Sequence, residues 1–411
     1  MLLEACRRAA GSAWNGLRRL KSQIVYSLPT ELWEIIIDYA LTDPFFLDTD
    51  CSPVNFYYFA TTHRVQSAAH VDRNSYDQRS RSLGAVCRMW RLIIEGRKRI
   101  WVHVALSSPV WDIGPETRRV EIAIDTSPNA NATDGARHTT VGFQNVQVIA
   151  LYGFRSTPLT LDMEGDAVEL REILNAVRQS GSSIHSFIYE DSIGLGPMDL
   201  HFITKTFPLL TTLTLHTGAI RGVLSIPALK ILNICSRHID ISQWDVYSLH
   251  HLALGDHDST LQNIRYESLN LGLIKANLLS LMVSSPFWVC LDASFWADHP
   301  SLQFLGVQTL YTNGSKPIHD ARILCITGSR IESYDDPQLA LYYLLPQFPL
   351  LTTLITPNKR LHNPPWPTAA GYSALSKYCS IKEIAWYIGY DHKAKKPVEQ
   401  GRILKYVKRV L

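Results

Sequence analysis

The chain has 411 residues, 46% of them hydrophobic and 19% charged, and its formal net charge is +3. That length predicts two or more folded units, and the near balance of charge argues against nucleic acid or an anionic membrane as the main partner. No uncharged apolar run approaches the roughly 18 residues that a membrane-spanning helix needs. The seven cysteines are scattered and form no C-x-x-C pair, which is typical of the reducing cytoplasm or nucleus.

The first 26 residues are basic and almost free of acidic side chains. Two interpretations are open: a mitochondrial presequence, or an amphipathic helix that packs on the unit after it. We favour the helix, because the segment that follows has the features of a nuclear or cytosolic protein.

A helix is predicted after Pro29, in the segment SLPTELWEIIIDYAL at 27–41. Thr30 is the candidate N-cap, and Glu31 and Glu34 fall in the first turn, where the helix dipole favours acidic side chains. The apolar positions cover more of this helix than the stripe of roughly 100° that a surface helix buries. We therefore expect the helix to be covered on two sides, and we expect the segment around VCRMWR at 86–91 to pair with it and supply the second side.

A second helical segment is predicted within 82–104, SLGAVCRMWRLIIEGRKRIWVHV. Its apolar residues recur at helical spacing, and basic residues take the other face. These apolar residues are Leu83, Val86, Cys87, Trp90, Ile93 and Ile94. Gly96 is a candidate stop for the helix, and an extended stretch is predicted from Trp101 onward.

Together the two segments resemble the F-box, through LP-x-EL at 28–32, VCR-x-WR at 86–91 and the closing Trp101, in that order. An F-box is a small helical module that docks on the Skp adaptor of a cullin-based ubiquitin ligase, so the resemblance implies the same partners here. The adaptor-binding positions that it implies are Leu28, Pro29, Leu32, Ile36, Val86, Cys87 and Trp90. We expect Ile35, Ile37 and Tyr39 to face the interior of the module. An unrelated helical hairpin is the alternative.

The module departs from the F-box pattern by an insert at about 43–81, between its two helical segments. Loops of this length are uncommon and tend to be functional or disordered. The aromatic cluster at 56–59 favours packing on the module over a separate docking site. The chain thus divides into a basic extension at 1–26, an F-box-like module at 27–104, a repeat domain at 105–390 and a basic capping segment at 391–411.

The repeat domain is indicated by a heptapeptide, FPLLTTL, that occurs at 207–213 and again at 348–354. The template Leu-x-x-Leu-x-Leu, with any apolar residue at the fixed positions, recurs at intervals of commonly 19 to 30 residues. Its central residues are Ile149, Phe187, Leu213, Leu232, Leu252, Leu281 and Leu305, followed less regularly by Leu324, Leu354 and Ile384. Each unit is expected to add one strand to a parallel sheet with a shared core.

The template resembles irregular leucine-rich repeats. The resemblance implies a fold class in which the small helical module is followed by an α/β solenoid of parallel strands. The asparagine that normally follows the strand in that family is absent, because Gly218, Arg237 and His257 hold the equivalent positions. The alternative is an ordinary α/β domain, whose parallel strands are equally apolar.

The function of such a solenoid is expected on the strand face that points away from the core, since side chains along a strand alternate between its two faces. The residues predicted there as a target-binding surface mix polar and aromatic types, as protein-binding surfaces do. They are Thr212, Thr214, His216, Asn233, His251, Met282 and Phe304.

The chain contains no motif of a nucleotide-binding, hydrolase or metalloprotease site, so no cofactor is expected. The segment SLHHLALGDHDS at 248–259 comes nearest, and it is either a metal site or a strand with its polar turn. Its possible ligands are His250, His251, Asp256, His257 and Asp258. We favour the strand, because adjacent histidines on a strand face opposite ways.

These features predict a protein that is not an enzyme but the substrate-recognition subunit of a Skp–cullin–F-box ubiquitin ligase. The helical module would dock on the adaptor, and through it on cullin, while the repeats hold a target protein. Ubiquitin transfer would gain from the raised effective concentration of the target. A repeat scaffold without a ligase role is the first alternative, and an enzyme on an α/β fold is the second.

Overall fold

The computed structural model describes the chain in separate segments. They are 28–41, 78, 80–96, 101–105, 113–125, 143–154, 184–191, 197–217, 219–236, 239–255, 267–268, 273–283, 287–288, 293–307, 321–326, 348–357 and 383–387. The predicted extension at 1–26, the capping segment at 391–411 and most of the insert at 43–81 lie outside these residues.

Helices and strands alternate irregularly along the described chain. The helices are α2 (Thr30–Leu41), α5 (Arg88–Gly96), α7 (Leu200–Thr206) and α8 (Ala293–Asp298), with the 3-10 helix η2 (Phe143–Asn145). The strands of the main sheet are β1 (Trp101–Ala105), β2 (Arg119–Asp125), β3 (Val148–Phe154), β4 (Ser186–Asp191), β6 (Thr212–His216), β9 (Ile231–Cys235), β11 (His251–Gly255), β13 (Ser280–Val283), β15 (Phe304–Val307), β16 (Ile323–Ile326), β17 (Thr353–Pro357) and β18 (Glu383–Tyr387). Short strands pair separately as β5 (Pro197–Asp199) with β7 (Ala219–Arg221), β8 (Leu224–Ser225) with β10 (Trp244–Asp245), and β12 (Glu267–Ser268) with β14 (Phe287–Trp288).

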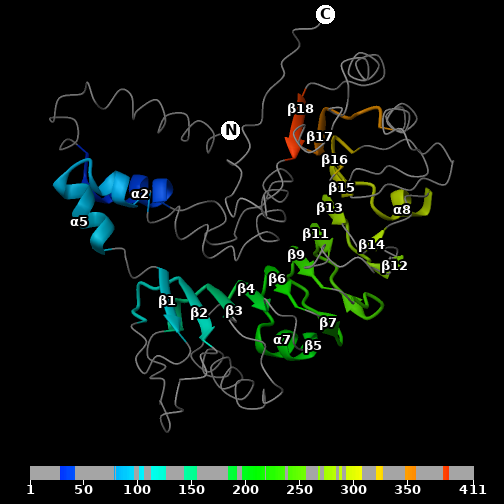
Figure 1. Ribbon diagram of the computed structural model, residues 1–411, viewed down its shortest axis with the longest axis horizontal. Coiled ribbons are helices and arrows are strands. Elements are labelled where there is room, and N and C mark those ends of the chain that lie inside the picture. Colours follow the sequence, from blue (N-terminus) through cyan, green and yellow to red (C-terminus); the bar gives the residue numbers. More distant parts are fainter. Residues whose placement is uncertain are drawn as a thin grey trace, which may run out of the picture.

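Among the residues that the structure describes, the main sheet has 12 strands, and their order in space is their order along the chain. Every pairing between the described strands is parallel. In Figure 1 the sheet follows an arc, with α7, α8 and the short strands β5, β7, β12 and β14 on its outer side. This order results when each repeat adds one strand beside the last, whereas a doubly wound sheet reverses its strand order. The chain therefore has a solenoid-like α/β fold.

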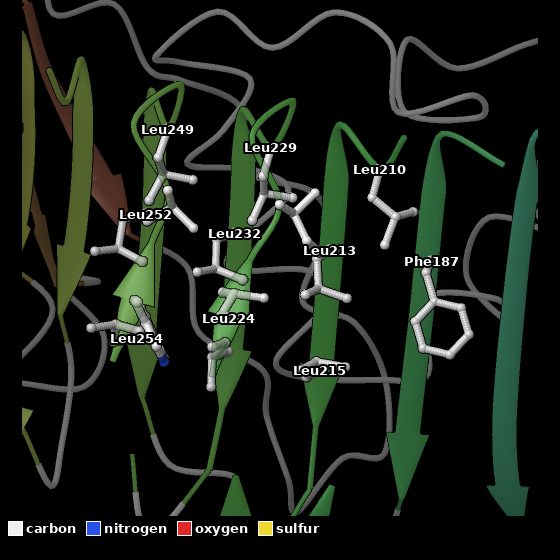
Figure 2. Packing of buried hydrophobic residues seen from close by; sticks show 14 of the residues in the cluster. Phe187, Leu210, Leu213, Leu215, Leu224, Leu229, Leu232, Leu249, Leu252 and Leu254 are labelled. Carbon is white, nitrogen blue, oxygen red and sulfur yellow. The ribbon is translucent and has the colours of Figure 1, made fainter. Parts of the chain in front are cut away.

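The register of the main sheet confirms the strand positions that the repeat template predicts. The central template residues form one continuous column across the strands, which Val102 and Val120 of β1 and β2 extend. The template residues of the column are Ile149, Phe187, Leu213, Leu232, Leu252, Leu281, Leu305, Leu324, Leu354 and Ile384. Figure 2 shows Phe187, Leu213, Leu232 and Leu252 side by side within this column. They belong to one buried cluster with residues of α7 and α8, so this apolar face of the sheet is the outer one. We call the opposite face the inner face.

The repeated heptapeptide FPLLTTL forms the turn into a strand at both of its sites. At the first site the carbonyl of Phe207 accepts a hydrogen bond from the amide of Leu210 at 3.3 Å. The equivalent bond at the second site, 348–351, measures 3.1 Å. Phe207 and Leu210 are buried, whereas Leu209 between them is exposed. The repeat is therefore explained by one turn that inserts two apolar side chains into the core.

The edge of the sheet at which the strands begin is held by a row of shared carbonyls. The carbonyl just before each of eight strands accepts hydrogen bonds from the two amides that lead into the next strand, as His185 does from Thr211 and Thr212 at 2.8 and 3.0 Å. The carbonyls that accept two amides belong to Arg118, Gln147, His185, Thr211, Lys230, His250, Leu279 and Gln303. We call the part of this edge from β6 to β17 the turn edge, formed by residues 207–211, 226–230, 246–250, 273–279, 299–303, 321–322 and 348–352.

Helices α2 and α5 pack on each other through two tryptophans. The ring centroids of Trp33 and Trp90 lie 5.0 Å apart at an interplanar angle of 51°, and Ile37 and Ile94 complete a buried cluster. An aromatic pair of this kind is worth about 0.5–1.5 kcal/mol beyond its buried area. The sequence prediction that the two segments pair is thus confirmed. No helix among the described residues is long and apolar enough to cross a membrane.

The beginnings of the two helices differ in their caps. The carbonyl of Pro29 accepts hydrogen bonds from the amides of Leu32 and Trp33 at 3.1 and 3.3 Å. Pro29 therefore occupies the N-cap position, and Thr30, which the sequence analysis assigns to the cap, is the first helical residue. At α5 the amide of Trp90 donates to the Sγ of Cys87 at 3.5 Å, so the thiol takes the place of a capping side chain.

The repeat template misses the first two strands of the sheet. β1 begins at Trp101 and pairs with β2, so the sheet starts inside the segment assigned to the F-box-like module. In β2 the apolar residues Val120 and Ile122 alternate with Arg119 and Glu121. That alternation is the signal of a strand with two different faces, and it would have identified β2 without the template.

Candidate protein-binding surfaces

Helix α2 exposes an apolar stripe next to its buried face. Leu32, Ile35 and Ile36 are 45%, 58% and 43% exposed, and Leu28, just before the helix, is 37% exposed. Helical periodicity sets these side chains on one continuous stripe, between the buried Trp33 face and the acidic side that carries Glu31 and Glu34. A cluster of exposed large apolar residues on one short helix is typical of an interaction surface.

The structure divides the predicted adaptor-binding residues into two groups. Leu28, Pro29, Leu32 and Ile36 are all exposed, while Val86 and Cys87 are half-buried against the core of the helix pair. Trp90 is only 4% exposed, so its assignment to a partner surface is wrong in this structure. The physical reason is that the ring of Trp90 packs at a tilt against the ring of Trp33, and the two rings fill the contact between the helices.

The residues of α2 expected in the interior are also divided. Ile37 is completely buried, in agreement with the prediction. Ile35 is the most exposed apolar residue of α2, and its placement in the interior is therefore wrong. It lies on the side of the helix opposite Trp33 and Ile37, and α5 covers only the side that bears these two residues. The side chain of Tyr39 lies outside the described residues.

The predicted target-binding residues lie on the inner face, as their position in the strands requires, but they are buried. Their exposed fractions are Thr212 0%, Thr214 1%, His216 2%, Asn233 0%, His251 5%, Met282 1% and Phe304 0%. The prediction that they form an exposed surface is therefore wrong. Strands of a sheet lie about 4.8 Å apart, so each side chain in a column is flanked by a neighbour on both sides.

Met282 and Phe304 show how the inner face closes on itself. Gly306 follows Phe304 by two residues in β15 and lies beside Met282 of β13, and a Cβ placed on it would meet Met282 Cγ and Phe304 Cε1, both at 3.2 Å. The two large side chains thus cover the glycine. Met282 and Gly306 are direct partners in the register of β13 and β15. These residues fill the inner face and are not available to a partner.

A charged cluster lies on the inner face at the β1–β2 end of the sheet. Arg119 Nε donates to Glu121 Oε1 at 3.0 Å, and both side chains are almost fully buried. His103 Nδ1 lies 3.6 Å from Glu121 Oε2, and the Arg119 guanidinium lies 5.0 Å from the ring centroid of Trp101. Burial alone would raise the pKa of Glu121, but Arg119 and His103 outweigh it, and the pKa lies below its ordinary value.

Two further inner-face side chains have shifted pKa values. Burial raises the pKa of Glu190 in β4 to about 7. Burial, together with the neighbouring His250, lowers the pKa of His251 in β11 to about 4. Both shifts favour the neutral form. The inner face therefore carries less charge near neutral pH than its residue types indicate.

Replacing Glu190 by glutamine should stabilise the protein above pH 7 but not at pH 4.5. The folded state holds the Glu190 proton more tightly than the unfolded chain, so this carboxyl contributes stability below pH 4.5 that is lost as the pH rises through about 7. Glutamine keeps the neutral form, and the gain should reach at most about 3 kcal/mol. Urea unfolding of the unaltered protein and the variant at pH 4.5 and pH 8 measures this gain. His251 titrates in both proteins, so its contribution cancels in the difference between their unfolding free energies. An equal difference at the two pH values would show that Glu190 is not the titrating group.

The histidine-rich segment predicted as a strand is confirmed as one over its described part. His250 precedes β11 and His251 begins it, and their rings meet edge to face with centroids 6.3 Å apart. The residues at 256–258 lie outside the described part of the chain. Among the described residues, no group of three or more His, Cys, Asp or Glu side chains is placed to hold a metal ion.

No protein-family model matches this chain, and no curated protein matches it. The functional conclusion therefore depends on the two candidate surfaces: the exposed apolar stripe of α2 and the long parallel sheet.

Proposed function

We propose that the protein is the non-catalytic substrate-recognition subunit of a Skp–cullin–F-box ubiquitin ligase. The observation that best supports this proposal is the exposed apolar stripe of Leu28, Leu32, Ile35 and Ile36 on a helix whose other side packs on α5. The F-box resemblance assigns three of these residues to the adaptor. An adaptor that covered the stripe would remove this apolar surface from water, which is the main favourable term in protein association.

The long sheet supports the second half of the proposal, in which irregular leucine-rich repeats hold the target. Parallel strands in chain order, with one column of apolar residues, are what such repeats produce. A subunit that binds the adaptor at one end and a target at the other raises the local concentration of the target at the ligase. In this proposal the protein acts in the cytoplasm or nucleus, where its adaptor and cullin partners would be found.

The double substitution Leu32→Asp/Ile36→Asp should abolish capture of a purified Skp-type adaptor by the full-length protein. Each carboxylate would be buried in an apolar contact without a partner, so affinity should fall by about 30-fold or more. Both positions are exposed in the free protein, so the fold should be retained, and circular dichroism checks this.

Leu92→Asp is the matched control for that experiment. It makes the same chemical change at a residue of α5 that is 58% exposed but lies on the charged side of that helix, beside Arg88 and Glu95. The control should capture the adaptor as the unaltered protein does. Equal capture by the double variant would refute docking through the stripe. Failure of the unaltered protein to capture any adaptor would favour the repeat scaffold without a ligase role.

A further inference from the structure

Outside the helix pair, exposed large apolar side chains gather at the turn edge of the sheet. Leu209, Tyr247, Leu273 and Leu350 are 57%, 62%, 45% and 47% exposed, and all four lie in turns that lead into strands. Val223, at 42%, is the other such residue among those described, and it lies between β7 and β8. Single exposed apolar residues are ordinary, but their concentration along one edge marks an interaction site.

Rigid rings line the same edge at one repeated position. In five of these turns the carbonyl of the first residue accepts the amide three residues later, as in the bonds from Leu229 to Ile226 and from Leu249 to Val246. The residue after the first is the one at which such a turn favours proline. It is exposed in every case: Pro208, Pro227, Tyr247, Pro300 and Pro349. When a partner binds this row of rings, few flexible side chains of the turn edge have to be ordered, and this lowers the entropic cost of binding.

The turn edge also carries positive charge. Lys230, Lys275 and Arg322 are exposed there, and none of the turns that define the edge contains an aspartate or glutamate. The turn into β2, at the β1 end of the same side of the sheet, carries Glu116. Asp245 and Asp298 immediately precede two of the turns, and Asp245 raises the pKa of the exposed Tyr247 hydroxyl. The edge itself therefore favours a partner with negative charge.

We propose that the turn edge binds an acidic polypeptide segment that carries apolar or aromatic side chains. The proposal rests on the proposed function in taking this polypeptide to be the target, and it moves target binding from the buried inner face to an exposed surface. Nucleic acid fits less well, because Tyr247 is the sole exposed aromatic residue of these turns and base stacking needs several. A membrane surface fits less well, because three separated cations fall short of the cluster that anionic lipids select.

A labelled random copolymer of glutamate and tyrosine tests the proposal with the full-length protein, by fluorescence anisotropy at physiological salt. The unaltered protein should bind it, and Lys230→Glu/Lys275→Glu should weaken binding by about 10-fold or more, through two reversed charges. Tyr247→Ser should weaken binding by about 5-fold, through the lost apolar contact. Arg88→Glu reverses an exposed charge on α5, outside the turn edge, and should change binding by less than about 2-fold.

Three results would overturn the proposal: no binding of the copolymer, equal binding by the double charge reversal, or tighter binding of polyuridylate or phosphatidylserine vesicles than of the copolymer. All substituted residues are exposed, so circular dichroism should show an unchanged fold. Adaptor capture through α2 should be the same for every turn-edge variant. A failure at the turn edge is therefore distinguishable from a failure of the proposed function.

Discussion

Replacing Glu121 by glutamine should lower the free energy of unfolding by about 3–5 kcal/mol. The carboxylate accepts from Arg119 Nε at 3.0 Å, and both side chains lie beneath the surface of the inner face. Glutamine keeps the shape of the side chain but removes the charge, so the Arg119 cation would stay buried without its carboxylate. Chemical denaturation with urea, followed by circular dichroism, measures the change.

The double variant Arg119→Met/Glu121→Leu distinguishes two effects on stability: burying the Arg119 cation without its carboxylate, and removing both charges together. Replacing both charges with apolar side chains of similar size removes the cost of burying ions, so this variant should be about as stable as the unaltered protein, or more stable. His103→Ala should have a small effect, because the ring is partly exposed. A cost below about 1 kcal/mol for Glu121→Gln would contradict the burial of the pair.

Replacing Leu232 by alanine should destabilise the protein by about 2–5 kcal/mol. Leu232 is completely buried at the centre of the template column, between Leu213 and Leu252 on the neighbouring strands (Figure 2). The cavity would remove contacts with the strands on both sides. Leu209→Ala, at the exposed turn leucine, is the control and should stay within about 0.5 kcal/mol. Equal costs at the two positions would show that the template column is not the core.

The sheet could be predicted from the sequence because its signal is local and repeated. The apolar residues of each strand recur with period two, and the shared core requires the same pattern in every repeat. The template did not identify β2, because it requires an apolar residue three positions before the central one, and the residue three positions before Val120 is the polar Thr117. Thr117 is nonetheless completely buried, and its amide donates to the carbonyl of Gly114 at 3.0 Å. The turn from Gly114 to Thr117 therefore forms although Thr117 replaces the apolar residue of the template.

The exposure of the inner face could not be predicted, because it depends on residues far apart in the sequence. The alternation within β6 or β11 assigns each side chain to a face, but the packing of that face is set by neighbouring strands. Met282 and Phe304 close over Gly306 from two different repeats. The pairing of Arg119 with Glu121 was likewise missed, although the two residues are alternate positions of one strand.

In the helix pair, too, the sequence did not show which side of a helix is buried. The breadth of the apolar surface on α2 correctly predicted contact with the second segment. It did not identify which side α5 covers, because several apolar faces of one helix compete for the same partner. The tryptophans decide this: Trp33 and Trp90 offer the largest apolar area, and they take the centre of the contact. Leu32, Ile35 and Ile36 are left exposed as a consequence.

Hydrogen–deuterium exchange of the full-length protein, with and without a purified Skp-type adaptor, tests the central claim most directly. If the α2 stripe is the docking surface, the adaptor should slow amide exchange in α2 and α5, while β6, β9 and β11 exchange as before. Unchanged exchange in both helices, or protection confined to the strands, would contradict docking of the adaptor through α2.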